Sequence, residues 1–464
     1  MDTRTMAQTP IDLLIEARYI VPVEPFDTTL EHHSIAIRGG RIEAILPSDE
    51  ARRLYLAREI VNLPAHIVTP GLVNLHTHAA MTLMRGLADD LPLMRWLHEA
   101  IWPAEARHVS HAFVRDGSLL AGSEMLRGGI TTCNDMYFFP QASAEAFDRL
   151  GLRAVIGITV IDFPSQYASD ADDYLNKGLA SFESWRGHPL IQFALAPHAP
   201  YTVSNRSFER IGILAEELEI PIHIHIHETA DEIAHSLRDF GQRPIARLES
   251  LGLLGPNLIG VHAVHLDPQD IERLGRHHCA IAHCPTSNMK LASGTAPVSR
   301  LLEQGLSVGL GSDGAASNNR LDVLEEMRQA ALIAESIQRA DIVITTALIP
   351  GRKAPILVTK EHVASMKAGS VIVDLAARAG GNVEGSEPGQ ETRTPNGVLI
   401  LAPKNPASAL SQHASLTFSR NLEKLILHFA RDGAWTMAPD DEIQKGCLIL
   451  RAGELVHPRL KEPS

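Results

Sequence analysis

The 464-residue sequence predicts an α/β protein whose central part is a (β/α)8 barrel, also called a TIM barrel. From residue 71 onward, short apolar segments typical of buried strands alternate with longer segments of helical spacing, which is the pattern of parallel β/α units. Polar residues follow the end of one apolar segment after another, where such barrels carry their chemistry. An open doubly wound sheet is the alternative, but it would not predict polar residues at so many strand ends.

Three segments differ in their pattern of apolar and polar residues. Residues 1–65 alternate between the two, which predicts a small, incomplete β-domain of short antiparallel strands at 11–15, 34–38, 41–45 and 59–63. Residues 66–335 carry the barrel, with strands expected at 71–78, 130–136, 153–161, 191–198, 220–228, 258–266, 279–285 and 307–313. Intervening helices are expected, for instance over 114–126, 205–218 and 231–251. Residues 336–464 form a separate α/β segment.

Composition and charge narrow the class of partner. The formal net charge of −13 argues against a nucleic-acid or anionic-membrane surface, because both need basic patches. No apolar run reaches 18 residues, so we expect no membrane span. The four cysteines, Cys133, Cys279, Cys284 and Cys447, form no Cys-x-x-Cys pair and no secreted disulfide pattern. We therefore expect a reduced cytoplasmic protein with a small-molecule substrate; a homo-oligomer is compatible with these features.

The first predicted barrel strand ends in His-Thr-His. Side chains alternate along a strand, so His76 and His78 point to the same face and could bind one metal ion. Two ordinary histidines in a polar loop are the alternative. The 23 histidines of the chain, many of them within apolar runs, prompt a search for further ligands.

A second histidine-rich stretch, 221–228, places His223, His225 and His227 on one face of a predicted strand. A coincidental ladder would desolvate three imidazoles without gain, so we expect at least one to bind metal. Glu228 follows at the strand end, where a carboxylate beside a metal site acts as a general acid or base.

Two later strands add further polar ends. His262 and His265 follow the sixth predicted strand, and Asp313 ends the eighth. Residues 309–314 also match Gly-x-Gly-x-x-Gly. A dinucleotide site is disfavoured there, because Asp313 would repel a pyrophosphate.

Four stretches, in this order, resemble the amidohydrolase superfamily and, more narrowly, the 5-methylthioadenosine/S-adenosylhomocysteine deaminases. They are Pro70–Met81, His223–Ile233, His262–His265 and Ser312–Asn319, within a likeness that runs from about residue 10 to about residue 334.

The resemblance implies one divalent metal held by His76, His78, His225 and Asp313. Binuclear relatives use a carboxylated lysine from the fourth strand, and 191–198 contains no lysine. Three nitrogens and one carboxylate suit Zn²⁺, and Fe²⁺ stays open.

The resemblance also implies hydrolytic deamination of an adenine nucleoside, in which activated water attacks C6. It makes Glu228 the proton shuttle to the ring N1, while His262 and Asp313 orient the water and accept its proton. Deamination or dechlorination of another N-heterocycle, such as guanine or a triazine, is the alternative. Cys279 and Cys284 are expected to be small core residues rather than nucleophiles.

Three substrate contacts are implied. The resemblance places Trp96 against the substrate, Glu105 on the ribose hydroxyls and His198 on the nucleoside. Trp96 could equally anchor an amphipathic helix in the core, and Glu105 taken alone would be a solvated helix charge.

The C-terminal segment has a different resemblance. Stretches 340–355, 366–377 and 380–382 resemble the α subunit of NAD(P) transhydrogenase, and the likeness extends to about residue 458. Residues 341–346 and 370–375 predict buried parallel strands separated by a helix, and 408–429 predicts an amphipathic helix, as in the tail of a Rossmann-like domain. Its Gly-rich phosphate-binding turn would lie upstream, so we expect no NAD site. Asp374 and Asn382 are expected at a solvated strand end, with a remnant of a cofactor edge as the alternative.

The chain is therefore expected to be chimeric, with a joint near 335–340. The β-domain would lack partner strands and expose strand edges and apolar surface, which predicts marginal stability. An inactive transhydrogenase-like fragment and a non-catalytic misassembled product are the alternatives to a deaminase.

Overall fold

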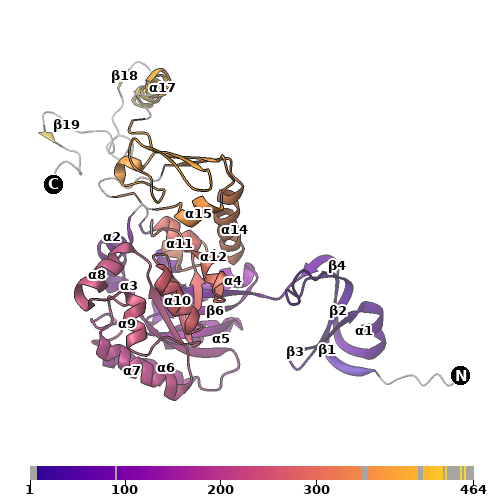
Figure 1. Cartoon of the computed structure of the whole chain (residues 1–464). Helices are drawn as coiled ribbons and strands as arrows, with labels where there is room; N and C mark the ends of the chain where they lie inside the picture. Colours follow the sequence, from indigo (N-terminus) through magenta and orange to yellow (C-terminus); the bar gives the residue numbers. More distant parts are fainter. Residues whose placement is uncertain are drawn as a thin grey trace. The chain divides into compact units, whose positions relative to one another are not determined.

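The computed structural model describes residues 8–88, 91–346, 353–354, 356–405, 411–431, 434–435, 441, 450–451 and 454–455. The chain divides into two compact units, Met1–Ser336 and Ile337–Ser464, and each is treated by itself. Figure 1 traces the elements along the chain. None of the described helices is both long and apolar enough to cross a membrane.

Within the described residues, eight parallel strands form one sheet in the order β12-β11-β10-β9-β8-β7-β6-β5. β12 returns to β5, where the Asp313 backbone N–H donates to the His76 carbonyl at 3.0 Å. The predicted (β/α)8 barrel is confirmed. The strands are β5 Leu72–Thr77, β6 Ile130–Tyr137, β7 Arg153–Val160, β8 Ile191–Pro197, β9 Ile222–Ile226, β10 Leu258–His262, β11 Ala280–His283 and β12 Ser307–Leu310.

Helices surround this sheet (Figure 1). The longer ones are α4 His111–Arg127, α5 Pro140–Leu150, α6 Ala171–Ser184, α7 Asn205–Leu218, α8 Ala230–Phe240, α10 Pro268–Arg276 and α14 Val323–Arg339. The shorter ones are η1 Ala79–Met84, α2 Leu93–Trp96, η2 Leu97–Ile101, α3 Trp102–His108, α9 Pro244–Ser250, α11 Pro285–Lys290, α12 Val298–Glu303 and α13 Ala315–Asn318. Five helices begin at a side chain that caps a free backbone N–H: Ser110, Asp170, Ser204, Thr229 and Asp267.

The barrel core consists of branched apolar side chains on strands β7 to β11. Ile156, Ile158, Leu195, Ile224 and Ile281 are at most 1% exposed, and each such burial contributes about 1.5–3 kcal/mol. This packing holds the strands rigidly, so the residues at their carboxyl ends have fixed positions.

Several strands end earlier than predicted because residues at their ends adopt left-handed backbone. β9 stops at Ile226, since His227 has φ +51°, and β10 stops at His262, which has φ +71°. The predicted ladder of three histidines on one face is therefore wrong at His227. Its imidazole Nε2 instead accepts the Ile245 backbone N–H at 3.1 Å, away from the strand face.

The N-terminal sheet has the strand order β3-β2-β1-β4, with strands β1 Thr9–Ile20, β2 Leu30–Arg38, β3 Arg41–Pro47 and β4 Tyr55–Val68. The predicted antiparallel pairing holds for β1 with β2 and for β2 with β3, but it is wrong for β4, which pairs with β1 in parallel. β1 and β4 are also longer than predicted, at 12 and 14 residues. The helix α1, Ser48–Leu54, lies on the connection that makes this parallel pairing feasible.

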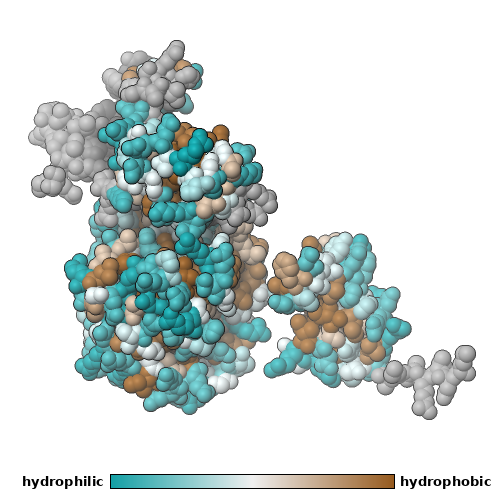
Figure 2. All heavy atoms as spheres, in the orientation of Figure 1, coloured by the Kyte–Doolittle hydropathy of each residue, from teal (hydrophilic) through white to brown (hydrophobic). Residues whose placement is uncertain are grey.

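Apolar side chains on β4 are exposed. Leu56, Ile60 and Ile67 are 60%, 56% and 64% exposed. Figure 2 shows apolar residues gathered over this sheet. The apolar surface expected of an incomplete β-domain is thus observed.

The second unit contains the sheet β13-β14-β16-β15, formed by β13 Ile342–Thr345, β14 Val371–Asp374, β15 Glu391–Arg393 and β16 Leu399–Leu401. β13 and β14 are parallel and are separated by helix α15, Lys360–Ser365, as predicted. The remaining elements are η3 Ala377–Ala379, α17 Ser411–Phe429, β17 Ala430–Arg431, β18 Ala434–Trp435, β19 Leu450–Arg451 and β20 Glu454–Leu455. The prediction that both strands are buried is wrong for β13. It lies at the sheet edge among the described residues, and Ile342 is 65% exposed.

The expected solvated strand end at Asp374 is also wrong. Asp374 and Asn382 are both fully buried. The turn after β14 folds back over the Asp374 carboxylate, which accepts the backbone N–H groups of Asn382 and Val383 at 2.9 and 3.1 Å and the Ser386 hydroxyl at 2.5 Å. The carboxylate therefore organises its own turn.

Candidate metal centre and active site

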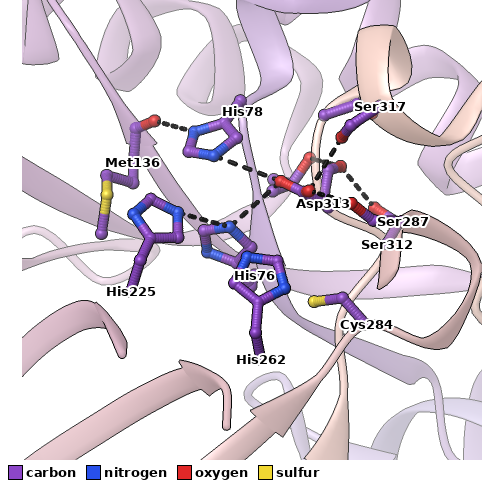
Figure 3. A network of polar contacts seen from close by, with 12 residues as sticks. His76, His78, Met136, His225, His262, Cys284, Ser287, Ser312, Asp313 and Ser317 are labelled. Atoms are coloured by element: carbon purple, nitrogen blue, oxygen red, sulfur yellow. Dashed lines mark hydrogen bonds and ion pairs between the residues drawn. The ribbon is translucent and has the colours of Figure 1, made fainter. Parts of the chain in front are cut away.

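Four side chains from three parts of the barrel converge on one point (Figure 3). His76 lies in β5 one residue before its end, His78 follows the strand, His225 lies in β9, and Asp313 follows β12. The His76 Nε2 atom lies 3.2 Å from both His225 Nε2 and Asp313 Oδ1, and His78 Nε2 lies 3.2 Å from the same carboxylate oxygen. One ligand atom from each of the three imidazoles falls within a 4.8 Å cluster.

The hydrogen bonds of the other ring nitrogens assign the tautomers. His78 Nδ1 donates to the Met136 carbonyl at 2.5 Å, and His225 Nδ1 donates to the His198 carbonyl at 2.7 Å. With Nδ1 donating, the neutral form of each ring carries its lone pair on Nε2, and this atom faces the cluster. Lone pairs directed at one another and at a carboxylate repel unless a cation lies among them. The donor set of three nitrogens and one oxygen thus fits a divalent ion such as zinc.

The Asp313 carboxylate is held by two hydroxyl donors. Ser287 Oγ and Ser317 Oγ donate to its Oδ2 at 2.5 and 2.8 Å, which leaves Oδ1 directed at the imidazoles. Hydrogen bonds to a carboxylate favour its ionised form, so the two hydroxyls keep the Asp313 carboxylate available as a candidate ligand.

An acid–base pair lies beside the cluster. Glu228 is 5% exposed, and its Oε2 lies 3.7 Å from His262 Nε2. Ser293 Oγ donates to Glu228 Oε1 at 3.4 Å, and His262 Nδ1 lies 2.8 Å from Asn288 Oδ1. Burial raises the pKa of Glu228, which favours the protonated carboxyl more than in an exposed glutamate.

Glu228 and His262 line a cavity together with His78, His225 and Asp313. One wall comes from the helical segment 93–108 and includes Trp96 and Glu105, both predicted from the sequence. Trp96 is 5% exposed, and its indole N–H has no hydrogen-bond partner among the described residues. The third predicted substrate contact, His198, lines the same cavity, and burial lowers its pKa to about 3.

Glu105 is the acidic group of that wall. The Tyr137 hydroxyl donates to its Oε1 at 2.7 Å. Burial raises the pKa of Glu105 to about 7, although the bond from Tyr137 opposes the shift. It is therefore not the solvated helix charge considered as the alternative.

The structure brings the nine predicted site residues together. Eight of them line the cavity, and His76 lies beneath this lining as part of the donor cluster. The other histidines of the sequence motifs lie around the centre: His223 Nε2 contacts His76 Nδ1 at 3.0 Å, and His265 Nε2 donates to the Ser293 carbonyl at 2.8 Å. Sequence reasoning missed Ser287, Tyr137 and Tyr201. Tyr201 lies three residues after the predicted substrate contact His198, and no local signal marked the other two.

The cysteines of the barrel are not part of this site. Cys279 and Cys284 are 1% and 0% exposed, and burial raises the pKa of each thiol. Their predicted role as small core residues agrees with this packing.

The barrel, the donor cluster and the adjacent carboxylate define a hydrolase built around a metal site. The family model described as "Amidohydrolase family" matches residues 67–346, and the chain belongs to this family. The predicted superfamily resemblance is confirmed.

Curated relatives carry narrower names. The 5-methylthioadenosine/S-adenosylhomocysteine deaminase of Saccharophagus degradans is 48% identical over 335 residues, which cover 72% of this chain and 75% of the relative. The corresponding protein of Teredinibacter turnerae is 44% identical and covers 75% and 80%. A solved adenosine deaminase from Xanthomonas campestris with bound zinc is 46% identical, has a TM-score of 0.70 and covers 71% and 75%.

More distant structures share the fold alone. A guanine deaminase from C. acetobutylicum is 22% identical with a TM-score of 0.64, and covers 70% of this chain and 79% of that one. The family match ends at residue 346, so the transhydrogenase resemblance of the C-terminal segment stays a prediction.

Proposed function

We propose that the chain is a hydrolytic deaminase of adenine nucleosides, which converts 5′-methylthioadenosine and S-adenosylhomocysteine to their inosine analogues and ammonia. The observation that carries this proposal is the position of Glu228 beside His262 in a cavity that also holds the Glu105 carboxyl. The names of the relatives at 44–48% identity support the same substrates.

His76, His78, His225 and Asp313 would hold one divalent cation. When bound, the cation supplies Lewis acidity that lowers the pKa of water from about 16 toward 7. Zn²⁺ is favoured by the donor set and by the zinc bound in the Xanthomonas campestris structure, and Fe²⁺ is the alternative.

The remaining steps belong to the chain's own residues. Asp313 Oδ1 and His262 Nε2 orient the attacking water and accept its proton as the bond from oxygen to C6 forms. Glu228 donates its proton to the ring N1, and its carboxylate then takes the remaining proton of the C6 hydroxyl as the C6 carbonyl forms. The proton first accepted from the water passes to the amino group, the C6–N6 bond breaks, and ammonia leaves. Burial raises the pKa of Glu228, which favours the protonated form that this step needs.

The substrate fits the cavity by class of contact. Trp96 would pack against the nucleoside with its large apolar surface. Glu105 would accept hydrogen bonds from the ribose hydroxyls, and His198 would contact the nucleoside from the β8 side. A carboxylate at this wall favours a ribosylated purine over free guanine or a triazine, which present no diol.

The test is ammonia release by purified protein loaded with one equivalent of Zn²⁺. We expect turnover of 5′-methylthioadenosine and S-adenosylhomocysteine, and little with guanine or a chlorotriazine. Fully loaded, soluble protein that releases no ammonia from either nucleoside would contradict the proposal. Preferential turnover of guanine or a triazine would support the alternative.

We also propose that the C-terminal segment is a transhydrogenase-like tail that binds no NAD. Its parallel strands β13, β14 and β16 support a partial Rossmann-like sheet. The buried Asp374 carboxylate accepts hydrogen bonds from its own turn and so is not available to a cofactor. Saturable NADH binding, measured by fluorescence, would contradict this.

The unpaired thiols of Cys133, Cys279 and Cys284 support a reducing cytoplasmic location.

A further inference from the structure

Arg247 in α9 is an unusual buried cation outside the proposed catalytic groups. It is 0% exposed and is the largest of the fully buried side chains among the described residues. Within that part of the chain it makes no ion pair. Its guanidinium instead donates to three neutral acceptors: the Pro200 carbonyl at 2.6 Å, the Val203 carbonyl at 2.9 Å and Asn205 Oδ1 at 2.8 Å.

This arrangement is costly for stability alone. A buried charge loses its hydration, and burial lowers the pKa of Arg247 to about 10, although the charge of Asp162 opposes the shift. The Phe240 ring lies 3.6 Å and the Phe208 ring 5.1 Å from the guanidinium carbon, which offsets part of that cost. An apolar side chain would fill the same space more cheaply, so the hydrogen bonds are the property that requires arginine.

Two of the three acceptors, the Pro200 and Val203 carbonyls, lie in the connection between β8 and α7, and Asn205 is the first residue of α7. Within this loop, His198 and Tyr201 line the cavity of the candidate site. The His198 carbonyl also accepts the hydrogen bond that assigns the tautomer of His225. The acceptors Pro200 and Val203 flank Tyr201, so the planar guanidinium bridges the backbone on both sides of it.

We propose that Arg247 is a positioning residue for nucleoside binding: by bridging the Pro200 and Val203 carbonyls, it holds the loop that presents His198 and Tyr201 to the substrate. The identity of the ligand rests on the proposed function, whereas the role in holding the loop does not. Arg247 itself touches neither the cavity nor the donor cluster.

The test compares R247M and R247K with the matched control R273M. Arg273 lies on α10, is part-buried and donates to Glu249 at 2.9 Å, but it contacts no residue of the loop. We expect the KM of R247M for 5′-methylthioadenosine to rise about tenfold, with kcat within threefold of wild type and one equivalent of zinc retained. A merely structural role would reduce the active fraction, and so lower apparent kcat at constant KM. Such a result, or an equal KM increase in R273M, would overturn the proposal.

Hydrogen–deuterium exchange gives a second readout that does not depend on turnover. The backbone N–H groups of Thr202 and Ser204 are hydrogen-bonded in the loop. We expect them to exchange faster in R247K than in wild type, because one ammonium cannot bridge two carbonyls in a fixed plane. If R247M does not fold, R247K still tests whether Arg247 holds the loop. Unchanged amide exchange and unchanged KM in R247K would refute the proposal. Wild-type protein without deaminase activity would refute the proposed function instead, and the exchange result would still test the loop.

Discussion

The substitution E105Q tests the assignment of the ribose-binding carboxylate. Glutamine keeps the size of the side chain and can still accept the 2.7 Å hydrogen bond from Tyr137, but it loses the charge. A hydrogen bond to a charged group contributes about 1.5–3 kcal/mol. Loss of one such bond to the ribose diol should therefore lower kcat/KM roughly 10- to 150-fold. A substrate that lacks the 2′ and 3′ hydroxyls should lose little.

The pH dependence gives the same assignment a second test. Burial raises the pKa of Glu105 to about 7, so the carboxyl is protonated below that pH and becomes a charged acceptor above it. The ratio of wild-type to E105Q kcat/KM should therefore rise up to tenfold per pH unit below about 7 and level off above it. Because the folded protein binds this proton more tightly than the unfolded chain, the contribution of Glu105 to stability is fully present below pH 4.5. It is lost as the pH rises through 7, by at most about 3 kcal/mol.

The assay measures kcat/KM for 5′-methylthioadenosine and for its 2′,3′-dideoxy counterpart across this pH range. E183Q is the matched control, since Glu183 is an exposed helical carboxylate that pairs with Arg186. The reasoning is refuted if E105Q retains the wild-type preference for the diol, or if the ratio of the two enzymes does not change through pH 7.

Three further predictions concern the centre and the fold. E228Q should lower kcat about 10²- to 10⁴-fold while zinc content, measured by metal analysis, stays at one equivalent; loss of the metal would show that Glu228 has another role. Removal of the metal with a chelator should abolish ammonia release and lower the melting temperature, and Zn²⁺ should restore both. G178A should cost about 1–3 kcal/mol in denaturant unfolding, because an added Cβ would lie 2.1 Å from Ile158 Cγ2. G275A is its control, since the nearest atom there is 3.4 Å away, and an equal loss in both variants would contradict the packing argument.

The barrel and its first histidine pair could be predicted because both follow from local periodicity. Alternation of faces put His76 beside His78, whereas His225 and Asp313 were expected as ligands only from the family resemblance; the structure places both beside this pair. The strand ends could not be predicted in the same way. His227 and Asp313 have φ of +51° and +58°, a conformation that costs a non-glycine residue energy and is stabilised by contacts distant in sequence.

The contacts that support the site residues also come from residues distant in sequence. Ser287 reaches Asp313 across 26 positions, and Arg247 reaches Pro200 across 47. No local pattern selects one serine or one arginine for such a contact. The parallel pairing of β1 with β4 is a similar case, because alternation predicts a strand and its buried face but does not specify the direction of its partner.

The C-terminal unit shows how a correct local prediction can have the wrong environment. The apolar run 341–346 does form a strand, but burial of both faces requires neighbours on both sides, and β13 has only β14 beside it among the described residues. Ile342 and Ile344 are consequently more than 60% exposed. Asp374 shows the converse, since a carboxylate expected in water is buried because its own turn supplies backbone donors. The candidate metal centre does not depend on the surroundings of the C-terminal unit. All four donors and Glu228 lie between residues 76 and 313, within the first unit, so every contact that orients them is supplied by the barrel itself.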